Sequence, residues 1–386
     1  MWLPNPDISY LGRTTFHREF RPFGIRQADR LSHIYIVGKT GVGKSTLIGN
    51  LARQDLAAGR GFALLDPHGD LVEGLWASLS EAERQRVVYL NAPNPRQPYG
   101  YNPLRQVRED KIPLAASGLL ETLKKQWPDA WGVRMEHVLR NCLYALLEQE
   151  GSTLPDILRL FNDDDFRAGV VRRVRNPVVR RFWQLEFENY PARLRAEAIA
   201  PIQNKLGALL SDPTLYRILV APQVDLHLRA VMDAGGVLLV NLAKGRLGED
   251  SSAILGGLLV STLGLAGLSR ADTSERRPFF LYADEFQNFT TLSTVSMMSE
   301  LRKYGVGMTL AHQHLQQLEP DIRSAVLGNA ASLISFRLGA EDAPVLAREL
   351  EPEVSVHDLI KLPNRCTYLK LMIDGSPSQP FSMATI

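Results

Sequence analysis

Glycines, two lysines and hydroxyl residues are concentrated between residues 38 and 46, where the chain reads Gly-Lys-Thr-Gly-Val-Gly-Lys-Ser-Thr. The spacing matches G-x-x-x-x-G-K-[ST], a phosphate-binding P-loop. Glycines let the backbone turn so that successive N–H groups face one phosphate cluster, and the next helix adds partial positive charge at its N-terminus. The pattern predicts an ATP site formed by Gly38, Thr40, Gly41, Val42, Gly43, Lys44, Ser45 and Thr46.

The segments on either side of this loop support that interpretation. The β-branched run 34–37 predicts a strand, and residues 46–52 predict a helix. A strand, loop and helix in this order argue against a glycine-rich turn without a ligand. We therefore expect Lys44 to reach the β- and γ-phosphates and the Ser45 hydroxyl to bind Mg²⁺.

A second group of chemical residues follows the hydrophobic run 279–283, which ends in Asp284 and Glu285. We expect Asp284 to hold Mg²⁺, through a water, and Glu285 to polarise the attacking water as a general base. A solvated acidic pair after an ordinary strand is the alternative, but the P-loop upstream favours catalysis. The second acid favours an ATP hydrolase over a slow nucleotide switch.

Three further side chains are candidates for contact with the γ-phosphate. Gln313 ends the apolar run 308–312, and open α/β sheets bind ligands at the carboxyl ends of their strands. A surface glutamine is the alternative. Arg302 precedes the same run and could reach the γ-phosphate of a neighbouring subunit, although a solvated arginine at a helix end fits equally well. Arg337, after the run 332–336, is a second candidate for this role.

A Pro-His-Gly turn after the run 61–66 leaves two interpretations of Asp66. Its carboxylate could support Mg²⁺ or water indirectly, or it could accept hydrogen bonds within its own tight turn. The histidines 68, 312 and 314 lack the spacing of a metal-binding pair, so no histidine metal site is expected.

The composition excludes some classes of protein. The chain has 386 residues, 45% of them hydrophobic, which is enough for one large core or two domains. A formal net charge of +2 does not require a nucleic-acid partner. The two cysteines, Cys142 and Cys366, have no metal-ligand spacing and suit a reducing compartment. The first residues lack the pattern of a signal peptide, and the apolar run 253–268 is short for a membrane span. We expect a cytoplasmic protein with no membrane span.

The order of patterns divides the chain. We expect an extended lead-in at 1–30, a first part of an α/β core at 31–104, an all-helical insertion at 105–224 and a second part of the core at 225–386. The apolar runs of the two core parts are short and continuous, as in a parallel sheet buried on both faces. Residues 367–373 and 380–384 predict a closing pair of strands.

The helical insertion carries a basic cluster with interleaved aromatic residues. Arginine with aromatic side chains suits nucleic-acid backbones and stacked bases. A solvated charged face over an aromatic core is an equally good interpretation. The cluster comprises Arg167, Arg172, Arg173, Arg175, Arg180, Arg181, Arg193 and Arg195, with Phe182, Trp183, Phe187 and Tyr190.

These motifs, taken in order, resemble the HerA/FtsK superfamily of P-loop ATPases, and most of all the motor domain of conjugative type IV coupling proteins of the TraG/TraD kind. The resemblance rests on the P-loop, Leu-Asp-Pro-His-Gly-Asp at 65–70, Tyr-Asn-Pro-Leu at 101–104, Ala-Asp-Glu-Phe at 283–286, Arg-Lys-Tyr-Gly at 302–305 and Ala-His-Gln at 311–313.

The resemblance implies a RecA-like α/β core with a parallel-rich central sheet and an inserted all-helical domain. It also implies a hexameric ring through which DNA passes. Carried over by position, Lys44 and Ser45 bind phosphate and Mg²⁺, Asp284 and Glu285 form the Walker B pair, Gln313 is the sensor, and Arg302 is the finger that acts on the neighbouring subunit. Membrane-bound coupling proteins have N-terminal transmembrane helices, whereas the sequence printed here shows none. This departure argues against membrane-anchored conjugation and leaves open a free-standing relative, an excised motor domain, or a ring that serves a mobile-element or phage-defence system.

Two functions from different classes follow. The first is a ring-forming, ATP-dependent translocase that contacts DNA without sequence preference. The alternative is an ATPase that assembles or drives a protein partner in a secretion, defence or nuclease complex. A small-molecule kinase or nucleotide switch is a weaker third interpretation, because the pair Asp284-Glu285 and the helical insertion count against it.

Overall fold

The computed structural model describes residues 5–15 and 20–386; the expectations for residues 1–4 and 16–19 lie outside these residues. One 11-stranded sheet runs through the molecule. In spatial order, its strands are β2 (Pro22–Arg26), β1 (Ile8–Thr14), β15 (Phe381–Thr385), β12 (Cys366–Lys370), β11 (Ser332–Ser335), β3 (Ile34–Val37), β10 (Val306–His312), β9 (Phe279–Ala283), β4 (Gly61–Asp66), β8 (Val237–Asn241) and β5 (Val87–Asn91).

The strands from β11 to β5 are all parallel, which confirms the predicted parallel-rich core. Strands β3, β4, β8, β9, β10 and β11 are buried along their whole length. This explains their continuous apolar sequence, because helices cover both faces of a parallel sheet. Neighbouring residues such as Tyr35 and Ile36 enter different hydrophobic clusters, one on each face.

The N-terminal segment differs from the expected lead-in. Strands β1 and β2 pair with each other, and β1 pairs with β15 in antiparallel register. Leu11 and Ile25 are buried in the same cluster as the P-loop helix. The prolines and arginines of this segment hide the alternation of its two strands, so its sequence predicts a lead-in, whereas its backbone extends the central sheet. The expected closing strands are confirmed as β12 and β15, which pair in antiparallel register.

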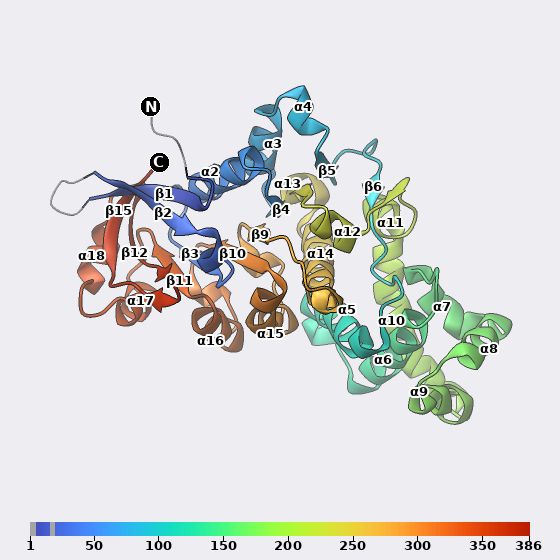
Figure 1. Ribbon diagram of the computed structural model, residues 1–386. Coiled ribbons are helices and arrows are strands. Elements are labelled where there is room, and N and C mark those ends of the chain that lie inside the picture. The colour runs from blue at the N-terminus through green and yellow to red at the C-terminus, as the bar shows by residue number, and fades with distance from the viewer. Residues whose placement is uncertain (1–4, 16–19) are drawn as a thin grey trace.

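Different helices cover the two faces of the sheet (Figure 1). Helices α2 (Lys44–Ala57) and α3 (Asp70–Ala77) pack on one face and contribute Leu47, Leu51 and Val72 to its cluster. The other face is covered by α14 (Glu249–Ser269) and α15 (Leu292–Leu301), and α5 (Ile112–Gln126) packs against both of these helices. The remaining helices of the core are α1 (Gln27–Arg30), α4 (Glu81–Arg84), α12 (Leu228–Asp233), α13 (Lys244–Leu247), α16 (Pro320–Asn329), α17 (Ala343–Glu349) and α18 (Val356–Lys361).

Residues 133–219 form helices that gather at one end of the molecule, drawn from blue-green to yellow-green in Figure 1, and α5 joins them to the core. They enter and leave the core side by side, because β6 (Tyr99–Gly100) pairs with β7 (Val224–Asp225). This ribbon is what an insertion between two parts of one core requires. Beyond α5, the helices are α6 (Val133–Leu147), α7 (Leu154–Asn162), α8 (Asp164–Arg173), α9 (Pro177–Arg181), a π-helix (Phe182–Phe187), α10 (Ala192–Ser211) and α11 (Pro213–Leu219).

The most apolar helix is a core helix in this fold. The segment Glu249–Asp272 is the one helix of the described residues that is long and apolar enough to cross a membrane, with a mean hydropathy of 1.7. Its apolar window is 78% buried within the protein. It packs against α5, α12 and α15, which explains why it is hydrophobic all round.

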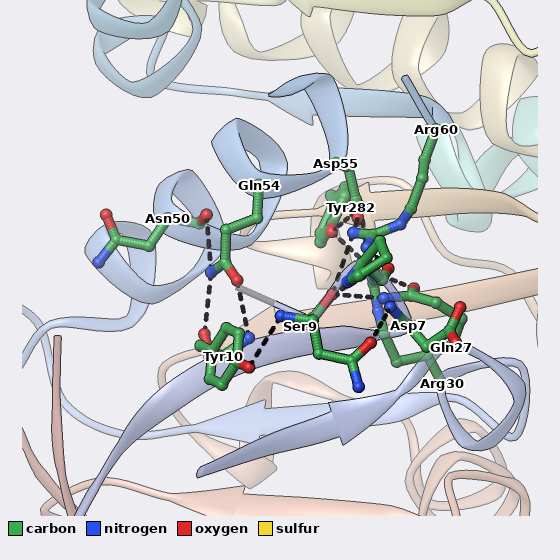
Figure 2. A network of polar contacts seen from close by, with 12 residues as sticks. Asp7, Ser9, Tyr10, Gln27, Arg30, Asn50, Gln54, Asp55, Arg60 and Tyr282 are labelled. Atoms are coloured by element: carbon green, nitrogen blue, oxygen red, sulfur yellow. Dashed lines mark hydrogen bonds and ion pairs between the residues drawn. The ribbon is translucent and has the colours of Figure 1, made fainter. Parts of the chain in front are cut away.

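A buried ionic network joins the P-loop helix to the sheet (Figure 2). Asp55 in α2 accepts hydrogen bonds from both terminal nitrogens of Arg30, at 2.7 and 2.8 Å, and from the Tyr282 hydroxyl in β9 at 2.5 Å. Arg60 adds a further ion pair to Asp55 at 2.8 Å. Burial alone would raise the pKa of Asp55, but the charge and hydrogen bonds of Arg30 hold that pKa below its ordinary value.

Candidate active site at the carboxyl ends of three strands

Three neighbouring strands bring the candidate residues to one edge of the sheet. The P-loop follows β3, Gln313 follows β10, and Asp284 and Glu285 follow β9. Because these strands are parallel and adjacent, their carboxyl ends meet. Residues almost 300 positions apart in sequence therefore lie within hydrogen-bonding distance of one another, at the edge where open α/β sheets bind ligands.

The loop needs its glycines for conformation and for space. Gly43, directly before helix α2, has a φ of 118°, in the region that favours glycine. A Cβ atom at Gly38 would lie 2.5 Å from the Cβ of Phe336. Val42 is buried and anchors the loop on the core, while Thr40, Ser45 and Thr46 are exposed at its surface. The backbone is thus shaped as the motif predicts.

Lys44 lies within the loop that it is expected to serve. Its ammonium donates to the carbonyl oxygens of Gly38 at 2.6 Å and Lys39 at 3.1 Å. Burial lowers the pKa of Lys44, and the charges of Glu285 and Asp284 oppose that shift. The amine is therefore held at the centre of the loop by carbonyls that an incoming phosphate can replace.

Asp284 contacts the P-loop directly. The Ser45 hydroxyl donates to Asp284 Oδ2 at 2.6 Å, and the Glu285 amide donates to Oδ1 at 3.0 Å. Burial raises the pKa of Asp284, and the nearby charges of Glu285 and Asp66 raise it further, against the Ser45 hydrogen bond and Lys44. A buried carboxylate with too little compensating charge, in contact with a serine hydroxyl, is a donor set that fits Mg²⁺.

Both oxygens of the Glu285 carboxylate are held by glutamine side chains. Gln313 Nε2 donates to Oε1 at 2.7 Å, and Gln287 Nε2 donates to Oε2 at 2.8 Å. Gln313 in turn accepts from the Thr40 hydroxyl at 2.6 Å, so it bridges the P-loop and Glu285. The backbone of Glu285 has a φ of 46°, a conformation uncommon for a residue with a side chain and frequent at functional sites.

Asp66 is used by its own turn. Its two oxygens accept hydrogen bonds from the backbone amides of His68, Leu71 and Val72, at 2.8 to 3.1 Å. This is the arrangement of an aspartate that closes a turn and caps a helix. Of the two interpretations of Asp66, the structure favours the turn, and its charge still contributes to the raised pKa of Asp284.

The two arginine candidates lie at opposite ends of the parallel strands, Arg302 at the amino ends and Arg337 at the carboxyl ends. Arg302 is exposed and precedes β10, at the end of that strand remote from the P-loop of its own chain. Its charge acts on His33, which precedes β3. Arg337 lies beside the P-loop, where its carbonyl accepts from the Lys39 amide. Its guanidinium donates to Leu362 O and Asn364 Oδ1, at 3.2 and 2.8 Å. A finger function for Arg302 therefore requires a second copy of the chain.

The His312 ring lies buried beside the site. Burial lowers the pKa of His312 to about 3, and its ring contacts the Tyr35 hydroxyl. Among residues 5–15 and 20–386, no group of three or more histidine, cysteine, aspartate or glutamate side chains could hold a metal ion.

The basic cluster of the helical region divides into two parts. Phe182, Trp183 and Phe187 are buried and pack on one another, so they form a core rather than a stacking surface. Arg167 is buried as well and pairs with Asp164 and Glu188 at 2.7 and 3.0 Å. The exposed arginines of the cluster are Arg172, Arg173, Arg175, Arg181 and Arg193.

Sequence reasoning missed two residues next to this site. Gln287 follows Glu285 by two positions, and that local spacing could have marked it. Arg365 donates its amide to Val42 O at 2.8 Å and so braces the P-loop, although it is more than 300 residues away in sequence. No local pattern could have placed Arg365 there.

Comparison with known proteins places this fold. The family model for the "type IV secretion-system coupling protein DNA-binding domain" matches residues 22–337. No curated protein matches the chain. The unbound bacterial conjugative coupling protein TrwB, solved as TrwBdeltaN70, has 17% sequence identity and a TM-score of 0.66, over 95% of this chain and 87% of that one.

Two further solved structures show the same fold. The plasmid coupling protein TrwB in complex with ADP and Mg²⁺ has 18% identity and a TM-score of 0.66, over 97% of this chain and 89% of that one. VirB4 of Thermoanaerobacter pseudethanolicus has 15% identity and a TM-score of 0.66, over 100% of this chain and 98% of that one. The family match covers most of the chain, and the P-loop core agrees with it. The chain therefore belongs to the type IV secretion-system coupling protein family of P-loop NTPases.

Proposed function

We propose that the chain is an ATP-driven DNA translocase that works as a ring of identical subunits. The observation that supports this most is the contact of Ser45 with Asp284, beside Glu285, at the end of the P-loop. A phosphate-binding loop, a metal-binding acid and a second acid are the groups that ATP hydrolysis needs in one place. Membership in a family described as a DNA-binding domain supports DNA as the partner.

In this proposal each residue has a defined task. The amides of the P-loop and the Lys44 ammonium bind the phosphates, and Ser45 and Asp284 hold Mg²⁺. Bound there, Mg²⁺ neutralises charge on the phosphate oxygens. Glu285 accepts a proton from the attacking water, and Gln313 orients that water while it contacts Glu285 and Thr40.

If Arg302 takes part in ATP hydrolysis, each active site must contain residues from two subunits. It lies at the amino-terminal end of β10, so only an adjacent copy could place it at an active site. A ring with heterologous interfaces makes such a contact at every subunit. The exposed arginines of the helical region are then available to the phosphate backbone of DNA, without sequence preference.

The test is the rate of ATP hydrolysis with and without DNA, at low and moderate salt, together with the mass of the particle. We expect DNA to stimulate turnover in the wild type, Glu285→Gln to abolish turnover while it still binds ATP, and the DNA-bound mass to be near six chains. Turnover that is indifferent to DNA, or a fully active monomer, would overturn the translocase and favour an ATPase that drives a protein partner.

A further inference from the structure

Two side chains of α5 hold the segment that follows Glu285, residues 286–293. We call this pair of side chains the clamp. The clamp consists of Glu121 and Lys125, which are four residues apart and therefore lie on one face of that helix. Lys125 Nζ donates to the carbonyl of Gln287 and, at 2.8 Å, to that of Thr290. Glu121 Oε2 accepts from the amide of Ser293 at 2.6 Å. The clamp holds both ends of the segment that follows Glu285.

The same segment reaches the site through Gln287. Its side chain donates to Glu285 Oε2 at 2.8 Å, while its carbonyl accepts from Lys125. Glu285 Oε1 accepts from Gln313, which accepts from Thr40 of the P-loop. A continuous path of hydrogen bonds therefore runs from α5, through the Glu285 carboxylate, to the loop expected to bind phosphate.

Two features indicate that this path is needed to orient Glu285. The left-handed backbone of Glu285 stores strain that surrounding contacts must maintain. A cavity of about 150 Å³ lies beside the segment and is lined by Lys125, Gln287 and Thr291. Phe286 and Phe289 are buried in the core and anchor the segment. The hydrogen bonds of Lys125 and Gln287 hold the side of the segment that faces this open pocket.

We propose that Lys125 and Gln287 are positioning residues that hold the Glu285 carboxylate toward the P-loop, so that the helical region controls the rate of ATP hydrolysis. The proposal rests on the proposed function, since it assumes that Glu285 is the general base. Neither residue needs to touch ATP. A partner that displaces α5 would change turnover through this path without entering the nucleotide site.

The first experiment compares steady-state kinetics of Lys125→Met, Gln287→Ala and a matched control, Lys124→Met. Lys124 is the neighbouring lysine; both residues are exposed, but the Lys124 amine lies 3.9 Å from Glu136 and outside the clamp. We expect kcat to fall about 10-fold in the first two variants, because a misplaced base loses rate rather than binding, while KM and the affinity for a fluorescent ATP analogue stay unchanged. The double variant should be no slower than Gln287→Ala, because both changes break one path.

A second measurement uses pH. The packing around its amine lowers the pKa of Lys125 to about 8, against the charge of Glu319 at the start of α16. The other acids close to Lys125 are Glu121, its partner in the clamp, and Glu249 on α14, which lines the adjoining pocket. Lys125 therefore loses its charge as pH rises through about 8, and kcat of the wild type should fall there. Lys125→Arg keeps its charge and should hold its rate to higher pH.

Hydrogen exchange separates this proposal from the translocase. Amides of residues 286–291 should exchange faster in Lys125→Met than in the wild type or Lys124→Met, and this readout needs no ATP turnover. Failure of DNA to stimulate the wild type would overturn the translocase alone. If Lys125→Met and Gln287→Ala match Lys124→Met in kcat and in exchange, the positioning proposal is wrong.

Discussion

A buried aspartate lies at each end of helix α2, and the pKa values of the two aspartates are shifted in opposite directions. Ser45 at its N-terminus bonds Asp284, whereas Asp55 near its C-terminus belongs to the helix itself. Asp55 is 0% exposed and Asp284 is 3% exposed, yet the pKa of Asp55 is lowered and that of Asp284 is raised. Because the two side chains are buried to a similar extent, their partners determine the direction of each pKa shift.

The partners differ in charge. Asp55 is matched by the guanidinium of Arg30, by Arg60 and by the Tyr282 hydroxyl. Asp284 has a serine hydroxyl and an amide as hydrogen-bond partners, and its charged neighbours are two acids, Glu285 and Asp66, against one cation, Lys44. A buried carboxylate whose negative charge is balanced by neighbouring cations holds elements of the fold together. One whose charge is not balanced can bind an added cation. The comparison predicts that substitutions at the two sites affect different properties.

The largest effect is expected for Asp284→Asn on turnover. Asparagine keeps the shape and the acceptor for Ser45 but removes the charge that is to hold Mg²⁺. We expect kcat to fall about 100-fold or more, and the Mg²⁺ concentration that supports half-maximal rate to rise. Steady-state hydrolysis in a Mg²⁺ titration measures both. A variant with wild-type kcat and the same Mg²⁺ dependence would show that Asp284 is not a metal ligand.

The next effect concerns stability rather than chemistry. Arg30→Met leaves Asp55 buried with only Arg60 and Tyr282 as partners, and breaking a buried ion pair in this way costs about 3–5 kcal/mol. We expect a lower unfolding midpoint in urea but a wild-type kcat for the protein that remains folded. The double variant Arg30→Met with Asp55→Leu should recover part of the loss, because no charge is then left buried. An unchanged unfolding midpoint for Arg30→Met would show that this network does not stabilise the fold.

The same contrast explains which features could be predicted from the sequence. The P-loop, the Asp284-Glu285 pair and the apolar strands are local patterns. In each, the residues that share a task or are buried together are consecutive in the sequence. The first two strands were missed, since their partner β15 lies at the other end of the chain. The Arg30–Asp55 pair and the Lys125 clamp have no local signature either. Their residue types are those of an ordinary solvated surface, and only the fold brings them to their partners.

The smallest expected effect is the one that tests the comparison most directly. Because the pKa of Asp284 is raised in the folded protein, its charge is disfavoured there, and the ionised carboxylate costs stability at every pH above the ordinary pKa of an aspartate. Asp284→Asn should therefore stabilise the nucleotide-free protein at pH 7 by about 1 kcal/mol, as removal of an uncompensated functional charge commonly does.

The gain should shrink as pH falls, because the wild-type carboxylate then takes up a proton and loses the same penalty. Addition of Mg²⁺ and a non-hydrolysable ATP analogue should reverse the order, because only the wild type has the charge that the cation compensates. Thermal unfolding at pH 7 and at a pH near the ordinary pKa of an aspartate, with and without these ligands, measures all four cases. A nucleotide-free Asp284→Asn protein that is less stable than the wild type would mean that Asp284, like Asp55, is there to hold the fold.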